Sequence, residues 1–284
     1  MILIVDFGSQ TTHLIARRLK DLGAVSLIVA PEDAVSSVQN EKPQGIILSG
    51  GPSSVYEKGA PTIDKEIFSF DVPMLTICFG MQLTSHLLGG EVVSGRKEYG
   101  PARLTLKDPS TSLRMTILKD LPDEFTVWMS HGDEVLSMSG NFVILGSTEH
   151  VPYAFVADDM KKYYGLQFHP EIEHTEYGGV ILENFIEICG VEKKQHVLDP
   201  GKMIASIRET VGDAHVIAAV SGGLDSTVAA TLVARAIGEQ LIPIHINSGL
   251  MREGTVEAVK HYFKDTLKIQ PIILNKKSVF LKTL

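Results

Sequence analysis

The sequence predicts an α/β protein in which a doubly wound parallel sheet with antiparallel additions is followed by an incomplete second parallel α/β unit. Over about the first 90 residues, short apolar runs rich in β-branched residues alternate with amphipathic stretches. From about 91 to 168, strand-like runs follow one another without long helices between them. The alternation of strand and helix patterns then resumes after residue 200. These three observations predict two α/β domains of unequal size.

The first part of the chain carries four runs that are typical of buried strands, at 2–7, 25–30, 45–50 and 73–78. Residues 11–23 have apolar side chains at helical spacing, and Gly23 marks the helix end. Short buried strands joined by helices favour parallel pairing. We therefore expect these strands to form one parallel sheet.

The middle part is expected to be an antiparallel addition to that sheet. Its predicted strands are 102–107, 125–130, 142–148, 153–158 and 163–169. A helix is predicted over 174–190, with Cys189 packing on it. Residues 191–200 are charged, end in proline and lack an apolar pattern, so we expect a linker there between domains 1–190 and 201–284.

The last part repeats the α/β pattern. Helices are predicted at 201–212, 224–238 and 252–267, and strands at 215–223, 241–246 and 269–274. Because three strands make a small sheet, we expect this to be the N-terminal part of a truncated domain. Apolar helix residues such as Val228, Leu232 and Val233 should then be partly uncovered, and the unit should be marginally stable or depend on a partner.

Composition narrows the classes of function. The 284 residues are 44% hydrophobic and 21% charged, as in a globular protein. Acidic residues number 34 against 26 basic ones, and no basic run is present, which disfavours nucleic acid as a partner. No run approaches the ~20 apolar residues of a membrane span, and two cysteines without a C-x-x-C pair fit a reducing compartment. We expect a cytoplasmic protein with no membrane partner.

Cys78 is a candidate nucleophile. It ends an apolar run and is followed at once by Phe79, Gly80 and a helical pattern, which predicts a sharp strand-to-helix turn. Such a turn exposes the thiol at the carboxyl edge of the sheet, and the Phe79 amide can donate to an oxyanion. The alternative is a buried core cysteine, because free cysteines are often buried.

His169 and Glu171 are candidate partners for Cys78. They lie two residues apart at the end of a predicted strand, so both side chains should project to one face and Pro170 to the other. A carboxylate beside an imidazole fixes its tautomer and raises its basicity. Taken alone, the pair could also be a structural histidine near a surface glutamate. Together with Cys78 it predicts a nucleophile, a base and an orienting group.

Two further segments could bind a small polar substrate. The glycine turn at 49–52 leaves backbone amides accessible, and residues 130–133 supply hydroxyl and backbone groups, unless each is an ordinary turn. A zinc site could in principle use Cys78, His131, His169 and His174. Because no ligand pair has the spacing of a metal site, we expect no metal there.

Residues 220–227, VSGGLDST, predict a phosphate-binding loop that differs from the Walker pattern. Gly222 and Gly223 permit close backbone approach, and the amides that begin the following helix point at an anion. Hydroxyls come from Ser221, Ser226 and Thr227. Asp225 would repel phosphate unless it faces Mg²⁺ or caps the helix, and an ordinary strand–turn–helix with Asp225 as N-cap is the alternative.

These motifs are recognisable together. Cys78-Phe79-Gly80-Met81-Gln82, Leu48-Ser49-Gly50-Gly51-Pro52 and His169-Pro170-Glu171 resemble class I glutamine amidotransferases. The segment SGGLDST resembles the pyrophosphate loop of ATP pyrophosphatases. The two in this order, with DFGSQ at 6–10 and SHGD at 130–133, resemble the two-site enzymes that use glutamine to convert xanthosine monophosphate to GMP. The resemblance spans essentially the whole chain.

The resemblance implies a flavodoxin-like first domain and the following roles. Cys78 forms a glutamyl thioester, with His169 as base and Glu171 as orienting group. The oxyanion and glutamine are bound by Gly50, Gly51, Phe79, Gln82, Ser130 and His131. ATP and pyrophosphate are bound by Ser221, Gly222, Gly223, Leu224, Asp225, Ser226 and Thr227. Mg²⁺ arrives with ATP, with Asp225 as its contact, and there is no tightly bound cofactor. The substrates are glutamine, ATP and xanthosine monophosphate, and family members dimerise through a C-terminal region that we expect this chain to lack.

The sequence also departs from the family pattern. Thr76 and Phe79 stand where the family usually has Gly and Tyr, and Asn247, Ser248 and Thr255 replace acidic and amide positions. We therefore expect weakened nucleotide or metal contacts and an incomplete synthetase step. Two alternatives stay open: an amidotransferase for another acceptor, and a truncated glutamine-binding regulatory protein.

Overall fold

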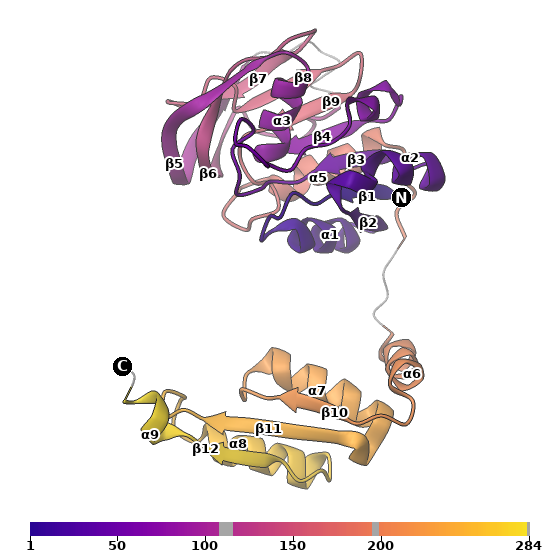
Figure 1. Cartoon of the computed structure of the whole chain (residues 1–284), viewed down its shortest axis with the longest axis vertical. Helices are drawn as coiled ribbons and strands as arrows, with labels where there is room; N and C mark the ends of the chain where they lie inside the picture. The colour runs from indigo at the N-terminus through magenta and orange to yellow at the C-terminus, as the bar shows by residue number, and fades with distance from the viewer. Residues whose placement is uncertain (108–115, 195–198, 283–284) are drawn as a thin grey trace. The chain divides into compact units, whose positions relative to one another are not determined.

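The computed structural model describes residues 1–107, 116–194 and 199–282, with Arg96 by its backbone only. Residues 195–198 of the predicted linker and 283–284 of the predicted second domain lie outside the described residues. The chain divides into two compact units, Met1–His196 and Val197–Leu284, which are taken in turn (Figure 1).

The first unit is built on a nine-stranded sheet of described strands (Figure 1). Its order is β2 (Ser26–Val29), β1 (Ile2–Val5), β3 (Gly45–Leu48), β4 (Met74–Ile77), β9 (Tyr163–Leu166), β8 (Phe155–Asp158), β7 (Val143–Ser147), β5 (Glu91–Leu106) and β6 (Glu124–Ser137). The first five strands pair in parallel and the remaining pairs are antiparallel. The order of the parallel strands is flavodoxin-like, as predicted.

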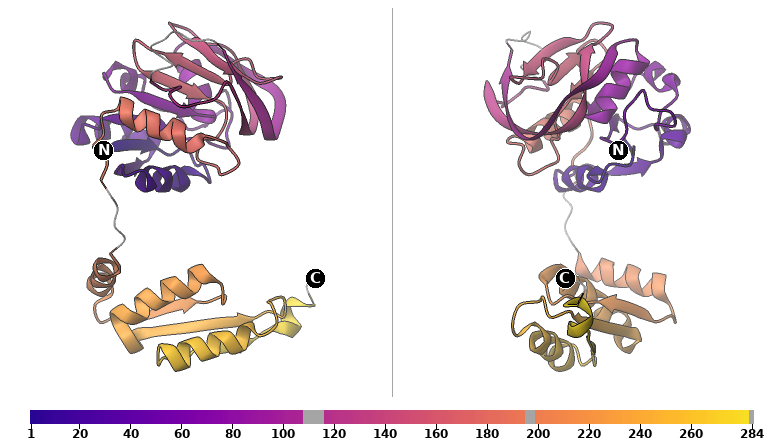
Figure 2. Two further views of the ribbon diagram at one scale, coloured as in Figure 1. Left: turned by 180° about the vertical axis from the view of Figure 1, so that it is seen from behind. Right: turned by 60° about the vertical axis from the view of Figure 1, so that its left-hand side comes forward.

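Helices cover both faces of the parallel strands. Alternate residues of β1 enter two separate cores: Ile2 and Ile4 belong to one, and Leu3 and Val5 to the other. The first core receives α1 (Thr12–Asp21) and α5 (Gly178–Ile188), and the second receives α2 (Ala34–Glu41) and α3 (Phe79–Leu87). Cys189 packs in the first core, as predicted. Short 3₁₀ turns occupy Pro31–Asp33 and Lys65–Ser69. Figure 2 shows the helices on either side of the sheet.

Three predictions for the first unit were wrong. The strand at 163–169 was expected in the antiparallel addition, and β9 does pair antiparallel with β8, but its other edge pairs in parallel with β4 and joins it to the parallel strands. The SHGD segment was expected after a strand, but it lies inside β6 because β5 and β6 run on as a long antiparallel ribbon. The sequence also missed α2, whose eight residues carry little apolar pattern. For β9 and β6, pairing with a distant segment decided the structure, and the local pattern did not.

The second unit contains a three-stranded parallel sheet among its described residues. Its order is β10 (Val216–Ala219), β11 (Leu241–Asn247) and β12 (Ile272–Asn275). The helices are α6 (Pro200–Val211), α7 (Leu224–Ile237), α8 (Thr255–His261) and α9 (Lys277–Phe280). A 3₁₀ turn spans Gly238–Gln240, and a π-helical turn at Tyr262–Thr266 extends α8. Ala230, Val259 and Phe263 form the core with Leu241.

Apolar surface of the second unit is uncovered within this chain. Ile217, Ile246, Ile272 and Leu274 are exposed on its three strands. On α7, Val228 is exposed and Leu232 and Val233 are half-buried, as predicted. Over the residues that the structure describes, no helix combines the length and the apolar character needed to cross a membrane.

Candidate active site

The carboxyl ends of the parallel strands bring the predicted site residues together. Cys78 follows β4, the glycine turn follows β3, and His169 follows β9. β1 lies between β2 and β3, and the segment after β1 leads into α1. In open α/β sheets, ligands bind at this edge, where the strand order reverses.

Cys78 occupies the predicted elbow. It is the N-cap residue of α3, with φ 47° and ψ −106°, a left-handed conformation that is costly for a non-glycine residue. The turn is close-packed, since a Cβ on Gly80 would lie 2.5 Å from the Leu48 carbonyl oxygen. The Sγ atom of Cys78 lies 3.5 Å from the carbonyl oxygen of Ser130 and 3.7 Å from Nε2 of Gln167. The structure therefore confirms the turn, but the expected exposure of the thiol was wrong: Cys78 is 4% exposed and packs in the first core. It still contributes to the lining of the pocket described below.

His169 and Glu171 form a buried pair. Nδ1 of His169 donates to Oε1 of Glu171 at 2.8 Å, because the carboxylate can only accept. The backbone differs from the prediction: β9 ends at Leu166, and the pair lies in the turn that follows. That turn is fixed by the His169 amide, which donates to the Trp128 carbonyl at 3.1 Å, and by Thr175 Oγ1, which donates to the His169 carbonyl at 2.6 Å.

The charge of His169 is set by its two partners. Burial lowers the pKa of His169, but hydrogen bonds and the charges of Cys78 and Glu171 outweigh it and raise the pKa to about 10. The imidazole is thus protonated at neutral pH between a sulfur and a carboxylate. This arrangement places a proton on His169 that can be given to a leaving group.

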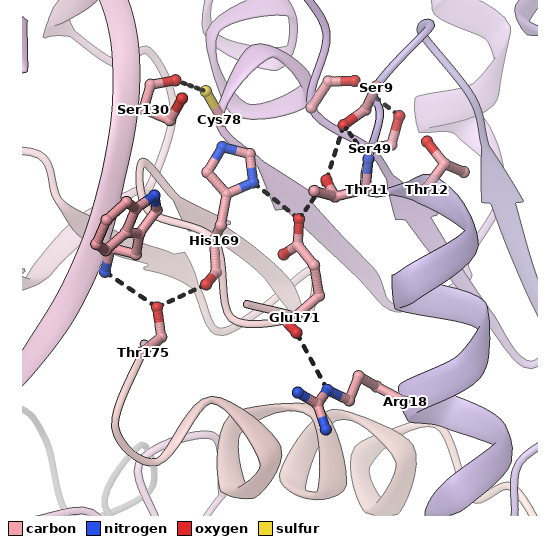
Figure 3. A network of polar contacts seen from close by, with 12 residues as sticks. Ser9, Thr11, Thr12, Arg18, Ser49, Cys78, Ser130, His169, Glu171 and Thr175 are labelled. Atoms are coloured by element: carbon pink, nitrogen blue, oxygen red, sulfur yellow. Dashed lines mark hydrogen bonds and ion pairs between the residues drawn. The ribbon is translucent and has the colours of Figure 1, made fainter. Parts of the chain in front are cut away.

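The N-cap residue of α1 and a residue within this helix, neither of which the sequence singled out for the site, hold Glu171 (Figure 3). Thr11 Oγ1 donates to Glu171 Oε1 at 2.7 Å, and Arg18 Nε donates to the Glu171 carbonyl at 3.1 Å. Thr11 and Arg18 lie more than 150 positions before Glu171. No local pattern could connect them, because the contact depends on how α1 packs.

The glycine turn after β3 allows close approach of the neighbouring groups. A Cβ on Gly50 would lie 3.0 Å from His169 Cε1, and one on Gly51 would lie 2.9 Å from the Phe7 carbonyl oxygen. Phe79 is the first residue of α3, so its amide is among those that a helix leaves unpaired. A Cβ on Gly51 would also lie 3.3 Å from Phe79 Cδ1, so the absence of a side chain leaves room between the two residues.

A pocket of about 530 Å³ opens beside Cys78. Its lining includes the predicted residues Gly51, Cys78, Gln82, Ser130 and His131. It also includes Tyr56, Lys97 and Tyr99, which the sequence did not single out for the site. Asp133 lines the pocket too, and was named only as part of the segment 130–133. Tyr56 donates its hydroxyl to Asp133 Oδ1 at 2.7 Å, and Gln82 Nε2 donates to the Asp133 carbonyl at 3.0 Å. Lys97 and Tyr99 reach the pocket because β5 begins at Glu91, well before the predicted start at residue 102.

His131 lies in the wall of this pocket. Its Nδ1 lies 3.0 Å from the Asp133 carbonyl oxygen, and its Nε2 lies 3.6 Å from Oε2 of Glu98. Burial lowers the pKa of His131 despite the nearby carboxylates. In the part of the chain that the structure describes, neither Nε2 of His131 nor Oε2 of Glu98 has a hydrogen-bond partner.

The residues considered for zinc do not form one cluster. His174 packs against Trp128, with ring centroids 4.8 Å apart. Outside residues 108–115, 195–198 and 283–284, no group of three or more His, Cys, Asp or Glu side chains could hold a metal ion.

The predicted phosphate loop lies between β10 and α7 in the second unit. Gly222 has φ +84°, and a Cβ there would lie 2.6 Å from Thr255 Cγ2. The hydroxyls brace the loop itself: Ser226 Oγ accepts from the Ser221 amide at 3.2 Å, and Thr227 Oγ1 donates to the Gly223 carbonyl at 2.8 Å. The alternative with Asp225 as N-cap was wrong, because Gly223 is the N-cap residue and Asp225 is exposed in the first turn. Leu224 is 78% exposed.

Three residues that depart from the family pattern stabilise the turn after β11. Asn247 Oδ1 accepts from the Gly249 amide at 3.1 Å, and Ser248 Oγ accepts from the Leu250 amide at 3.3 Å. Thr255 Oγ1 donates to the Arg252 carbonyl at 2.7 Å. Their effect on nucleotide binding stays a prediction.

Comparison with known proteins agrees with this geometry. Residues 3–189 match the family described as glutamine amidotransferase class-I. The chain belongs to this family. It is 44% identical to "GMP synthase [glutamine-hydrolyzing]" of Nitratiruptor sp. over 286 residues, and 45% identical to the protein of that name from Aquifex aeolicus. Each match covers 100% of this chain and 55% of the relative, so the chain spans about half the length of the curated relatives it matches.

Solved structures show the same class I amidotransferase architecture. The structure of a putative GMP synthase subunit from Thermoplasma acidophilum superposes with a TM-score of 0.60 at 32% identity, over 66% of this chain and 93% of that chain. A glutamine amidotransferase from Methylobacillus flagellatus has a TM-score of 0.50 at 15% identity, over 70% of this chain and 98% of that chain, and shares the fold.

Proposed function

We propose that this chain hydrolyses glutamine to glutamate and ammonia, with Cys78, His169 and Glu171 as the catalytic triad. The observation that carries the proposal is the strained elbow of Cys78 beside the hydrogen-bonded His169–Glu171 pair. A cysteine at a helix start, an imidazole and a carboxylate are the parts that nucleophilic acyl transfer needs.

The chemistry follows from the positions of these groups. The sulfur of Cys78 attacks the side-chain carbonyl carbon of glutamine, and the amides of Gly51 and Phe79 stabilise the oxyanion. His169 gives its proton to the departing nitrogen, so ammonia leaves and a glutamyl thioester remains. His169 then takes a proton from water, which attacks the thioester and releases glutamate while the sulfur is restored. Glu171 keeps the imidazole oriented and stabilises its charge throughout.

The pocket beside Cys78 suits the amino-acid end of glutamine. Its charged and polar wall includes Gln82, Ser130, His131 and Asp133. The buried carboxylate of Asp133, held by the Tyr56 hydroxyl, provides a negative group for an α-ammonium. Gly50 leaves the space in front of His169 open.

In the whole protein, the ammonia would aminate xanthosine monophosphate to GMP. This acceptor is supported by the GMP synthases that match the entire chain at about 44% identity. It is also supported by the loop Ser221–Thr227, whose helix start and glycines suit the pyrophosphate of ATP. ATP would arrive with Mg²⁺, which the exposed Asp225 in the first turn of α7 would help to hold. Binding of ATP and xanthosine monophosphate, and dimerisation of the whole protein, are part of the same proposal. Free cysteines fit a reducing cytoplasm.

The glutaminase proposal is tested on the purified chain. Glutamate and ammonia should form from glutamine, and Cys78→Ala should abolish their formation. Cys189→Ala removes the other cysteine and should leave the rate unchanged, because Cys189 does not line the pocket beside Cys78. Hydrolysis that persists in Cys78→Ala would overturn the proposal.

The acceptor is tested separately with ammonium chloride in place of glutamine. Xanthosine monophosphate and Mg-ATP should yield GMP and AMP with a protein of the relatives' full length. We expect no GMP from residues 1–284 alone, because much of the apolar surface of the second unit is uncovered. Amination of a different nucleotide would reject this acceptor and leave the glutaminase proposal standing.

A further inference from the structure

We propose that Thr11 is a positioning residue of the amidotransferase site, whose hydroxyl holds the carboxylate of Glu171 against the imidazole of His169 (Figure 3). The inference rests on the proposed function for the catalytic role of His169. The contacts themselves are independent of that role. Thr11 is not among the residues that line the pocket, so its contribution would act through Glu171.

One oxygen of Glu171 receives both side-chain hydrogen bonds. Thr11 Oγ1 and His169 Nδ1 donate to Oε1 at 2.7 and 2.8 Å. The second oxygen, Oε2, is buried and accepts no hydrogen bond from the described residues. Glu171 is 0% exposed, so bulk solvent does not reach its carboxylate. The position of Oε1 therefore depends on Thr11 as well as on His169.

The Glu171 carboxylate decides which way the hydroxyl of Thr11 donates its proton. Ser9 Oγ lies 2.8 Å from Thr11 Oγ1, and a carboxylate cannot donate. The single hydroxyl proton of Thr11 goes to Glu171, so the Ser9 hydroxyl donates to Thr11. The Thr11 amide donates back to Ser9 Oγ at 3.1 Å, which fixes the turn. A row of donors thus runs from Ser9 through Thr11 to Glu171.

The hydroxyl of Thr11 has no role in capping its helix. Thr11 is the N-cap residue of α1, where a threonine hydroxyl ordinarily accepts from a backbone amide of the first turn. Here the side chain makes no such bond. Its hydrogen bond goes instead to a residue 160 positions away. Local helix stability therefore does not account for this side chain.

Helix α1 holds the same glutamate at a second point. Arg18, two turns further along, donates to the backbone carbonyl of Glu171 at 3.1 Å. Thr11 fixes the carboxylate and Arg18 fixes the backbone. With both ends of Glu171 held by one helix, removal of the Thr11 hydroxyl should release the carboxylate while the backbone stays in place.

The test compares three variants of the full chain. Thr11→Val keeps the size of the side chain and removes the hydroxyl, so we expect kcat for glutamine hydrolysis to fall about tenfold, the scale of one hydrogen bond to a charged group. KM should stay within about twofold, because Thr11 does not line the pocket. Thr11→Ser should restore most of kcat. Thr12→Val is the matched control: it removes the neighbouring buried hydroxyl, which donates to Asp6 and not to Glu171, and should leave kcat unchanged.

A second readout requires no glutamine. Histidine ¹⁵N NMR follows the protonation of His169, and its midpoint should move to lower pH in Thr11→Val but not in Thr12→Val. If the unmodified chain hydrolyses no glutamine, the proposed function fails while this titration still tests Thr11. Equal kcat and equal midpoints in Thr11→Val and Thr12→Val would overturn the proposal, as would Thr11→Ser as slow as Thr11→Val. If Thr11→Val does not fold, Ser9→Ala takes its place, because it removes the donor to Thr11. We expect a smaller loss of kcat in Ser9→Ala. A kcat and a His169 midpoint equal to those of the unmodified chain would reject the row of donors.

Discussion

At the scale of single residues, the two cysteines differ in environment enough to predict opposite reactivity. Cys78 lies at a helix start next to His169, whereas burial raises the pKa of Cys189 to about 12. A glutamine analogue with an electrophilic γ-carbon should label Cys78 in the folded chain and spare Cys189. Mass spectrometry of the digested protein measures both sites. Equal labelling of the two cysteines would contradict the assignment of the nucleophile.

The charge of His169 predicts a pH dependence. Its pKa is raised to about 10 in the folded chain, against about 6.5 for an unperturbed histidine. The protonated ring therefore stabilises the folded state fully below about pH 6.5, and this contribution is lost as the pH rises towards 10. Histidine ¹⁵N NMR should show His169 protonated at pH 8.

Two substitutions check the cause of that charge. Glu171→Gln and Cys78→Ser each change one of the two groups that raise the pKa of His169, and each should move the midpoint of His169 to lower pH. A neutral His169 at pH 7 in the unmodified chain would contradict the prediction.

His169→Ala should slow acylation by about 10²–10⁴-fold if the imidazole transfers the proton.

At the scale of elements, the turn between β4 and α3 requires Gly80. A Cβ there would lie 2.5 Å from the Leu48 carbonyl oxygen and 2.8 Å from that of Ser49, so α3 would have to move away from β3. Gly80→Ala should therefore destabilise the first unit by about 1–3 kcal/mol and slow the labelling of Cys78. Urea unfolding measures the first effect. Gly179→Ala is the control, because Gly179 lies in α5 with open space around it and alanine is favoured in a helix. Equal losses of unfolding free energy in the two variants would refute the packing argument.

The loop between β10 and α7 predicts anion binding. Its helix start carries unpaired amides, and Gly222 adopts φ +84° where a side chain would meet Thr255. Pyrophosphate should shift the backbone amide signals of Ser221–Thr227, and Gly222→Ala should abolish the shifts. Gly238→Ala provides a control, because Gly238 also has a positive φ but lies at the far end of α7 in open space. Unchanged amide signals at saturating pyrophosphate would argue against a phosphate loop.

At the scale of the whole molecule, the two units are predicted to differ in stability. The first has cores on both faces of its sheet, whereas the second leaves Ile217, Ile246 and Ile272 exposed. Residues 1–194 expressed alone should unfold cooperatively and keep the Cys78 reactivity. A dye that fluoresces on apolar surface should bind the full chain more strongly than residues 1–194. Ile217→Thr should reduce dye binding by the full chain. If the full chain and residues 1–194 bind the dye equally, the second unit does not expose the apolar surface that the dye detects.

The sequence by itself determined the parallel sheet and its reactive turns. The strands at 2–7, 45–50 and 73–78 are buried runs whose identity depends on local composition, so their prediction needed no tertiary information. The same holds for the elbow at Cys78, because a strand, a cysteine, a glycine and a helix follow one another directly along the chain. The bounds of α7 were likewise predicted to within one residue, since glycines flank an uninterrupted helical pattern.

Tertiary structure decided what depends on distant segments. The direction of β9 follows from its place beside β4, and its local alternation carries no information on parallel or antiparallel pairing. The length of β5 and β6 follows from their pairing with each other, which placed Lys97 and Tyr99 in the pocket. The roles of Thr11 and Arg18 arise because α1 packs beside the turn that carries Glu171. Hydrogen bonds between residues more than 150 positions apart leave no trace in local sequence, and for that physical reason they emerge only from the folded chain.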